Sequence, residues 1–408
     1  MRTARNACGR LGVVQKLSTL AFLCLSSVAG AQAPAKPTPR TPIMDAPAEL
    51  GVDAARTSIA KALGWIVSNQ RPDGAWASGS ADSLQVTFFG PETHFAFQYA
   101  ATALTTRALL EGEETPERRA ALERGLGWLC DVRMPKRTND WDIDCSWSAL
   151  YGFDGIARAA LDPRFAAAPW KERIAKRGRE LYELLDKNQS PEGGWGYYEG
   201  PVVSRRPTWA TSFSTATVVP ALVLARDELD WGVDGKLVER AVEYVRRCAL
   251  PTGAYEYDLN PVPRVSGGEM INDVKGSLGR IQVCNLARRK AGDPKMTDDV
   301  IRRGLELFLE HHRFLDAARL KPIPHESWYQ NAAYFYNFGH CYASLVVNEL
   351  PEAERESWHA RLRPHFVKVQ FADGSTYDFI GNGWAEASGT SFLALALQAG
   401  VPAAPITR

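Results

Sequence analysis

The chain has 408 residues, of which 45% are hydrophobic, and its 48 lysines and arginines are almost balanced by 47 aspartates and glutamates. An apolar fraction of this size is enough to build a large buried core. The near-zero net charge argues against nucleic acid or an anionic membrane surface as the main partner.

The first 31 residues have the pattern of a secretory signal peptide. Basic residues lead into an apolar run over 17–28, which ends in small residues at an A-x-A cleavage site. The run is short for a membrane span, so an uncleaved anchor helix is the weaker alternative. Residues 32–53 then form a Pro/Ala-rich linker, residues 54–400 the folded domain and residues 401–408 a tail. We therefore expect an exported protein, periplasmic or extracellular, without a membrane span after cleavage.

A short turn motif recurs along the folded domain. It reads QRPDGAW over 70–76 and QSPEGGW over 189–195, and weaker copies follow around Gly253 and Gly374. The turn glycines Gly74, Gly193, Gly253 and Gly374 are separated by 119, 60 and 121 residues. This spacing indicates a unit of about 60 residues that occurs six times.

Each unit has the pattern of two helices. The first is amphipathic and charged, and the second consists mainly of apolar and small residues, which is typical of a helix buried on all sides. The first helices are expected at 54–69, 118–132, 171–187, 236–248, 298–313 and 353–369, and the second at 92–110, 145–160, 212–226, 273–290, 332–350 and 388–399. We predict an all-α fold, an α/α toroid of six helical hairpins; an open superhelix of helix pairs fits the same period.

The glutamine and tryptophan of the turn have a structural explanation. A Gln side chain at a helix end can bind free backbone groups of its own helix or a neighbour, with the Trp packed over it. The glycine allows a positive φ after the helix end. We expect these residues to hold adjacent hairpins together.

The motif resembles the QW repeat of squalene-hopene and other terpenoid cyclases, which protein prenyltransferases share in a weaker form. The two copies that match well include Trp65 and Ile66 before the first turn and Leu184 and Leu185 before the second. The chain also resembles secreted bacterial proteins that carry prenyltransferase and squalene-oxidase repeats. The resemblance implies the toroid and a central cavity; it implies a reaction only weakly, since the chemistry of the site decides function.

The segment Asp142-Ile143-Asp144-Cys145 is the sharpest catalytic candidate. It is similar to the D-x-D-D acid motif of squalene-hopene-type cyclases, with Cys145 in place of the last aspartate. The resemblance places the proton donor at Asp144, and our catalytic hypothesis adds Asp142 and His94 in support. Alternatively, Asp142 or Asp144 caps the helix that starts there, or binds a ligand or metal.

Further residues at the starts of the second helices predict a ligand-binding surface. Aromatic faces there could stabilise a cation or stack on sugars, or could simply pack the core. The predicted ligand-binding residues are Trp147, Tyr151, Trp209, Asp273, Tyr334, His340 and Trp384.

No metal site and no cofactor are predicted. Asp144 and His340 are residue types found in the zinc site of protein prenyltransferases, but the 196 residues between them place them on opposite sides of a ring. His312 is expected on a solvated outer helix. The five cysteines after the signal peptide have no close pairs, so we expect buried small hydrophobic residues rather than a disulfide framework.

Three functional hypotheses remain. The first is a cyclase- or isomerase-like enzyme that uses acid catalysis by Asp144 on a neutral hydrophobic, possibly isoprenoid, molecule. The second is a polysaccharide-acting hydrolase or lyase, since the same kind of toroid hosts such activities. The third is a noncatalytic binding protein of the cell envelope. A C-G-E-Q thioester, a G-x-S-x-G elbow, a P-loop and an H-E-x-x-H motif do not occur in the sequence.

Overall fold

The structure, a computed structural model, describes residues 48–81, 89–139, 142, 144–197, 207–259, 270–379 and 382–401. The expected signal peptide, the linker up to residue 47 and residues 402–408 of the expected tail lie outside the described residues. The regular elements of the described part are helices. Every one of these helices is too short or too polar to cross a lipid bilayer.

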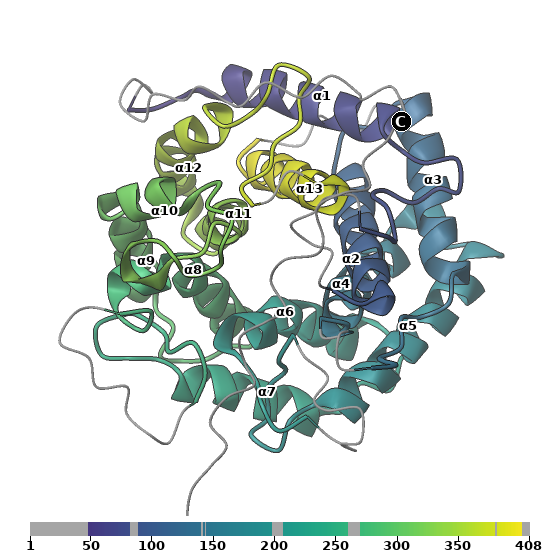
Figure 1. Ribbon diagram of the computed structural model, residues 1–408, viewed down its shortest axis with the longest axis horizontal. Coiled ribbons are helices and arrows are strands. Elements are labelled where there is room, and N and C mark those ends of the chain that lie inside the picture. The colour runs from purple at the N-terminus through teal and green to yellow at the C-terminus, as the bar shows by residue number, and fades with distance from the viewer. Residues whose placement is uncertain are drawn as a thin grey trace, which may run out of the picture. The chain divides into compact units, whose positions relative to one another are not determined.

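Six helices form an inner ring that closes on itself (Figure 1). They are α2 (Pro91–Leu110), α4 (Ser146–Ala160), α6 (Ser212–Glu228), α8 (Val274–Lys290), α11 (Phe335–Val347) and α13 (Gly383–Ala399). Each packs on the next, and α13 packs back on α2. The α/α toroid is therefore confirmed, and the open superhelix was wrong.

The outer ring consists of the six helices that precede these in the chain. They are α1 (Val52–Ser68), α3 (Pro116–Asp131), α5 (Trp170–Asn188), α7 (Gly235–Arg247), α9 (Asp298–Glu310) and α12 (Glu352–Val367). The last inner helix, α13, begins at Gly383, five residues earlier than expected, because Asn382 caps it by accepting from Ala385 N. The short helix α10 (Arg313–Ala318), between α9 and α11, was not predicted.

The two rings differ in how their helices are buried, as their sequences indicate. The outer helix α7 buries one face, with Leu237, Ala241 and Tyr244 turned to the core. The inner helix α2 is buried along almost its whole length by small residues such as Ala96, Ala100 and Ala103. Small side chains let the inner helices approach on both flanks, which closure of the ring requires.

Where its glutamine is present, the turn motif fastens one outer helix to the next. Gln189 Nε2 donates to Gly193 O at 2.7 Å and to Leu237 O of α7 at 2.9 Å. Trp195 Nε1 donates to Leu185 O at 2.8 Å. Gly193 has φ of +100°, and a Cβ there would lie 2.5 Å from Arg240 O. The motif is thus structural, as expected, although the tryptophan donates a hydrogen bond to the backbone as well as packing.

The last copy of the motif closes the ring. Gln370 Nε2 donates to Ser58 O of α1 at 3.0 Å, and Ser58 Oγ donates back to Gln370 Oε1 at 2.6 Å. These bonds join residues 312 positions apart in the chain. The eroded sixth copy therefore keeps the contact that links the end of the domain to its beginning.

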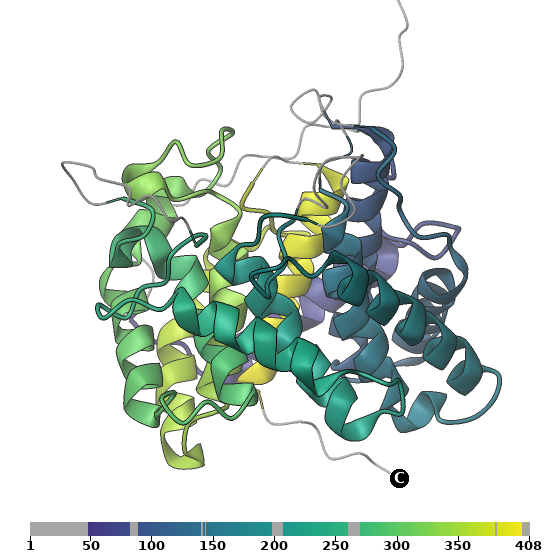
Figure 2. The same cartoon turned by 90° about the horizontal axis from the view of Figure 1, so that it is seen from below.

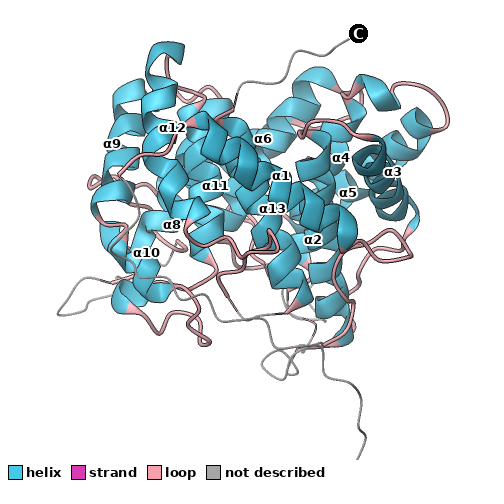
Figure 3. Cartoon of the chain, turned by 90° about the horizontal axis from the view of Figure 1, so that it is seen from above, coloured by secondary structure: helices cyan, strands magenta, loops and turns pink. Residues whose placement is uncertain are grey.

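The connections at the two ends of the ring differ in length. Those that lead from an outer to an inner helix are long, and their described parts lie together at one end (Figures 2 and 3). Those that lead from an inner to the next outer helix are short and lie at the other end. We call these the open end and the closed end.

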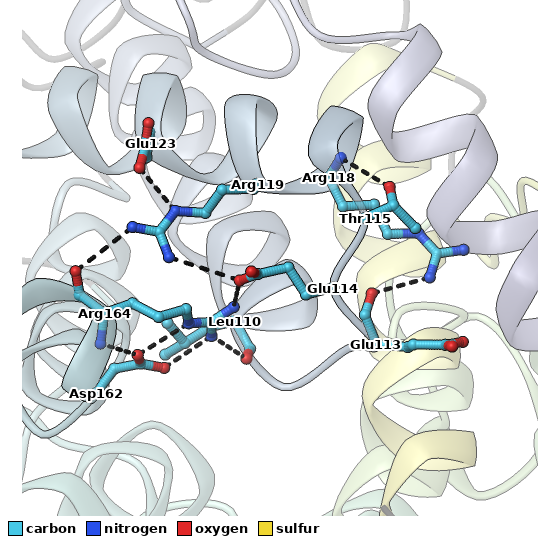
Figure 4. A network of polar contacts seen from close by, with 9 residues as sticks. All are labelled: Leu110, Glu113, Glu114, Thr115, Arg118, Arg119, Glu123, Asp162 and Arg164. Carbon is cyan, nitrogen blue, oxygen red and sulfur yellow. Dashed lines mark hydrogen bonds and ion pairs between the residues drawn. The ribbon is translucent and has the colours of Figure 1, made fainter. Parts of the chain in front are cut away.

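A network of charges holds the closed end together (Figure 4). Arg164 contacts Asp162 at 2.7 Å and Glu114 at 2.9 Å, and donates to Leu110 O at the end of α2 at 2.6 Å. Arg119 of α3 contacts Glu123 at 2.6 Å. The network links the connections after α2 and α4, so consecutive hairpins are fixed to each other there.

The cysteines behave largely as expected. The five described cysteines form no disulfide with one another, and four of them, Cys145, Cys248, Cys284 and Cys341, are buried. Cys130 is only half-buried. The described structure therefore depends on packing rather than on cross-links.

Candidate functional site

The inner ring encloses a cavity of about 710 Å³ that opens at the open end. Its wall consists mainly of aromatic and small apolar side chains. The residues that line it include Phe97, Asp144, Trp147, Tyr151, Tyr197, Phe213, His325, Tyr334, Phe335, Phe338, Asp378, Trp384, Ser388 and Phe392. A cavity of this size and character suits a small, largely apolar molecule.

The aromatic wall is ordered by helix geometry. Trp147 and Tyr151 lie one turn apart on α4, so they face the same way, and their rings stack at 5.6 Å and 17°. The ring of Tyr197 lies 6.2 Å from Trp147 and nearly parallel to it, at 2°. Phe213 of α6 continues the wall 6.1 Å from Trp147. These rings present π faces along one side of the cavity.

Asp144 is an acid without a balancing partner. It immediately precedes the first turn of α4, its backbone N donates to Thr93 Oγ1 at 3.3 Å, and its side chain lines the cavity. Its Oδ1 atom is buried and has no hydrogen-bond partner among the described residues. Burial raises the pKa of Asp144 to about 8, because the apolar surroundings disfavour the charged form. The carboxyl group is therefore mostly protonated at neutral pH.

A second acid, Asp378, lines the same cavity. It lies in the connection before α13, where its Oδ2 atom accepts from Asn337 N at 2.6 Å and its backbone carbonyl accepts from Leu320 N at 2.7 Å. Burial raises the pKa of Asp378 to about 7, although the hydrogen bond from Asn337 lowers it in part. The cavity thus holds two carboxyl groups that change charge near neutral pH.

The segment between α10 and α11 forms the rim of the cavity. Pro322, Ile323, Pro324 and His325 all line it, and Ile323 is 61% exposed, so this segment lies where the cavity meets solvent. His325 is held by two contacts, with Nδ1 at 2.7 Å from Gln330 O and Nε2 at 3.0 Å from Tyr334 Oη. It also adopts a positive φ of 64°, which is uncommon outside glycine. These contacts hold the His325 ring between Gln330 and Tyr334.

Five predicted site residues meet in this cavity: Asp144, Trp147, Tyr151, Tyr334 and Trp384. Trp209 lies behind the wall, with its ring 4.9 Å from Tyr197 and its Nε1 atom donating to Asp258 at 3.0 Å. Asp273 is exposed and accepts from Met270 N at 2.6 Å. His340 is fully buried outside the cavity, against α9 and α12.

The remaining two predicted catalytic residues do not line the cavity. Asp142 is buried and caps a neighbouring helix, because Oδ1 accepts from Glu92 N in the first turn of α2 at 3.0 Å and Oδ2 accepts from Thr138 Oγ1 at 2.6 Å. His94 is buried in α2 and packs 6.1 Å from the ring of Phe89. The capping alternative therefore applies to Asp142, although for α2 rather than α4, and not to Asp144.

Two features were missed or misplaced in the predictions from the sequence. Asp378 was missed, because the last inner helix was expected to begin only at residue 388, ten residues after it. Its place between the turn glycine Gly374 and the start of α13 matches that of Asp144 before α4, and this could have revealed it. The expectation that His312 lies on a solvated helix was wrong: it is 4% exposed, because its ring packs against Tyr336, His340 and His365.

Comparisons with known proteins identify the fold. No protein-family model matches the chain, and no curated protein sequence matches it. The GH76A alpha-1,6-mannanase from Salegentibacter sp. HEL1_6 matches with a TM-score of 0.51 and 12% identity over 86% of this chain and 98% of that one. The Lin0763 protein from Listeria innocua matches with a TM-score of 0.50 and 15% identity over 84% and 96%.

The type II terpene cyclase MstE from Scytonema is similar too, with a TM-score of 0.48 and 14% identity over 86% of this chain and 98% of that one. At identities this low, likeness in structure extends to the fold alone. The mannanase has the same all-helical α/α-toroid architecture as this chain, which agrees with the fold predicted from the repeat.

Proposed function

We propose that the central cavity binds a neutral, largely hydrophobic molecule of the isoprenoid class, and that protonated Asp144 acts on it as a general acid. The observation that carries this proposal is the buried, unpartnered Oδ1 of Asp144 in the wall of an aromatic cavity. A carboxyl group that serves as an acid has to hold its proton at the working pH, and burial of Asp144 supports this.

The lining supports a hydrophobic ligand over a polar one. Most of the wall is formed by side chains that offer no hydrogen bonds, such as Phe97, Phe213, Phe338 and Phe392. A sugar chain would lose hydration of its hydroxyl groups there with few partners in return, which is costly. An isoprenoid would gain from the same surface.

The chemistry that we propose is proton transfer through the two carboxyl groups. Asp144 gives its proton to the ligand, and the π faces of Trp147, Tyr151 and Phe213 stabilise the positive charge that develops. Asp378, whose pKa burial raises to about 7, is ionised in half of the molecules at that pH and can accept a proton at the end of the reaction. Two acids whose environments give them different pKa values suit these separate roles.

The test is to incubate the purified full chain with a neutral polyprenyl alcohol, geranylgeraniol, and to analyse the extract by mass spectrometry. We expect an isomeric product from the wild type. Asp144→Asn should bind the alcohol with unchanged affinity and form no product, because the amide cannot donate an acidic proton. Asp227→Asn, a matched change on the surface of α6, should retain full turnover. Equal turnover by Asp144→Asn would remove the acid from the mechanism.

A second candidate function has one observation in its favour. Two carboxyl groups and stacked aromatic rings in one cavity are also what a glycan-acting hydrolase or lyase uses. A variant of the mannanase named above is known in complex with alpha-1,6-mannotriose. Titration with this trisaccharide decides between the two: sugar binding that Trp147→Ala abolishes, together with no binding of the alcohol, would replace the isoprenoid proposal. Binding of the alcohol without turnover would instead favour the noncatalytic hypothesis.

We also propose that the protein is exported, on the strength of the N-terminal sequence. The prediction is checked by N-terminal sequencing of the protein from the native cell envelope. A start close to residue 32 supports it, whereas an intact Met1 would contradict it.

A further inference from the structure

Three histidines meet on the outer side of the inner ring, away from the cavity. His312 precedes α10, His340 lies on the inner helix α11 and His365 lies near the end of the outer helix α12. One ring nitrogen of each lies within 4.8 Å of the others. His312 and His340 are buried and His365 is half-buried. None of the three lines the cavity.

The proton on His312 is fixed by a carboxylate. His312 Nδ1 lies 2.9 Å from Asp316 Oδ2, and Lys368 Nζ lies 2.8 Å from Asp316 Oδ1. The contact with the ammonium group of Lys368 keeps Asp316 ionised, and an ionised carboxylate only accepts hydrogen bonds. His312 therefore donates through Nδ1, and in the neutral ring its Nε2 atom carries a free lone pair.

The proton on His340 is fixed in the same way by the backbone. His340 Nδ1 lies 2.7 Å from Tyr336 O, one helical turn earlier. A carbonyl oxygen is only an acceptor, so His340 also donates through Nδ1 and leaves the lone pair on Nε2. Yet the two Nε2 atoms lie 2.8 Å apart. Two neutral rings thus direct lone pairs at each other, which is repulsive unless a cation lies between them.

The third ring points to the nature of that cation. His365 Nδ1 is buried and has no hydrogen-bond partner among the described residues. A proton shared by His312 and His340 would explain their contact and leave His365 without a role. A metal ion would use a lone pair from all three rings.

We propose that His312, His340 and His365 bind a divalent transition metal ion, with zinc the best fit. Neutral imidazole is a preferred ligand of zinc, and metal-binding histidines typically donate their other N–H to a carboxylate or a backbone carbonyl. Asp316 and Tyr336 supply these two partners here. Zinc bound by three histidines keeps a fourth coordination place for water.

Binding requires a small adjustment of the rings. Zinc–nitrogen bonds of about 2.0–2.1 Å place two tetrahedral ligands roughly 3.3 Å apart, so the Nε2 atoms would separate by about half an ångström. The three nitrogens lie within 4.8 Å of one another, so partly exposed His365, the ring with the most freedom to move, would approach by up to about 1.5 Å. The three residues belong to the α9–α10 junction, to α11 and to α12. The ion would therefore tie the start of the short helix α10 to one helix of the inner ring and one helix of the outer ring.

The first experiment measures metal binding by the tag-free full chain. The protein is stripped with a chelator, titrated with Co²⁺ and then with Zn²⁺, and analysed by optical spectroscopy and elemental analysis. We expect one ion per chain, the intense visible bands of four-coordinate Co²⁺, their loss when Zn²⁺ displaces it, and a higher melting temperature with Zn²⁺. No binding by the wild type would overturn the proposal.

The second experiment uses variants and nuclear magnetic resonance of the imidazole nitrogens. His365→Gln, at a half-buried site, should abolish the Co²⁺ bands, while His311→Gln, next to the cluster in sequence, should keep them. In the metal-free wild type, His312 and His340 should carry their protons on Nδ1. Binding retained by His365→Gln, or a doubly protonated His312 or His340 in a chain that binds no metal, would contradict the proposal.

Discussion

Two buried carboxyl groups, one towards each end of the ring, have opposite surroundings. Asp154, towards the closed end, and Asp144, at the open end, are 5% and 9% exposed. Burial alone would raise the pKa of Asp154. The positive charges of Arg107 at 2.8 Å and Arg158 at 3.0 Å together have the larger effect, so the pKa is lowered. Asp144 has no such neighbour, and its pKa rises to about 8. The partners of a buried acid, more than its depth, decide its charge.

The paired charges and the unpaired acids contribute differently to stability. At the closed end, charges such as Arg164 and Glu114 are paired across consecutive hairpins (Figure 4). At the open end, two acids remain able to gain or lose a proton near neutral pH. The first arrangement holds the ring together, and the second costs stability, as is common at functional sites.

The largest effect is expected when the paired acid loses its charge. Asp154→Asn keeps the size of the side chain but leaves the buried guanidinium of Arg107 without its main counter-ion. We expect a loss of about 3–5 kcal/mol in the free energy of unfolding. Denaturant-induced unfolding at neutral pH measures it, and a loss under about 1 kcal/mol would show that the ion pair is not what holds this end.

The opposite sign is expected for the unpaired acid. The folded-state pKa of Asp144 is raised, so the folded protein binds more protons than the unfolded chain between about pH 4 and 8, and stability falls as the pH rises through that range. Asp144→Asn lacks this penalty. The variant should equal the wild type near pH 4 and exceed it by roughly 4 kcal/mol at pH 7. Unfolding curves at several pH values measure this, and a variant that is less stable at pH 8 would contradict it.

A smaller effect is expected at the turn motif around Gly193. Gly193→Ala combines a positive φ with a contact of 2.5 Å to Arg240 O. We expect a loss of about 2–3 kcal/mol in the free energy of unfolding. Gly232, with φ of +70° and open space around its Cα, is the matched control, and Gly232→Ala should cost only about 1 kcal/mol. Equal losses in the two variants would mean that the contact with α7 does not matter.

The smallest effect is expected at the exposed edge of the closed-end network. Glu114 is 49% exposed and contacts Arg164 at 2.9 Å. Glu114→Gln should cost less than about 1 kcal/mol, because solvent screens exposed ion pairs. The loss should shrink further in high salt, which thermal unfolding at two salt concentrations checks. If Glu114→Gln lost as much free energy of unfolding as Asp154→Asn, then burial and ion pairing would not explain why the charged groups of the ring differ in their contribution to stability.

Much of the fold could be predicted from the sequence, because it depends on short-range patterns. The spacing of Gly74, Gly193, Gly253 and Gly374 gave the repeat, and the distribution of small and charged residues distinguished inner from outer helices. The helix α10 was not predicted, because six residues are too few for a periodic pattern. Closure of the ring depends on contacts such as Gln370 with Ser58, which no local pattern reports.

The site was predictable only in part. Asp144, Trp147 and Trp384 could be found because they lie at or near the starts of inner helices, which share one end of the ring. Asp378 was missed although its place before α13 was a signal, and the cluster around His312 could not be found, because the contacts of each histidine are with residues distant in the chain. His312, His340 and His365 belong to three different helical segments, and their distance from one another appears only once the chain has folded.

The central claim is that Asp144 carries its proton at neutral pH, and carboxyl-carbon nuclear magnetic resonance tests it most directly. The signal is assigned as the one that Asp144→Asn removes, and it is followed as the pH rises through neutrality. We expect a midpoint of about 8. A midpoint near 4, the ordinary range of an aspartate, would show that Asp144 is charged at neutral pH and would remove its role as a general acid.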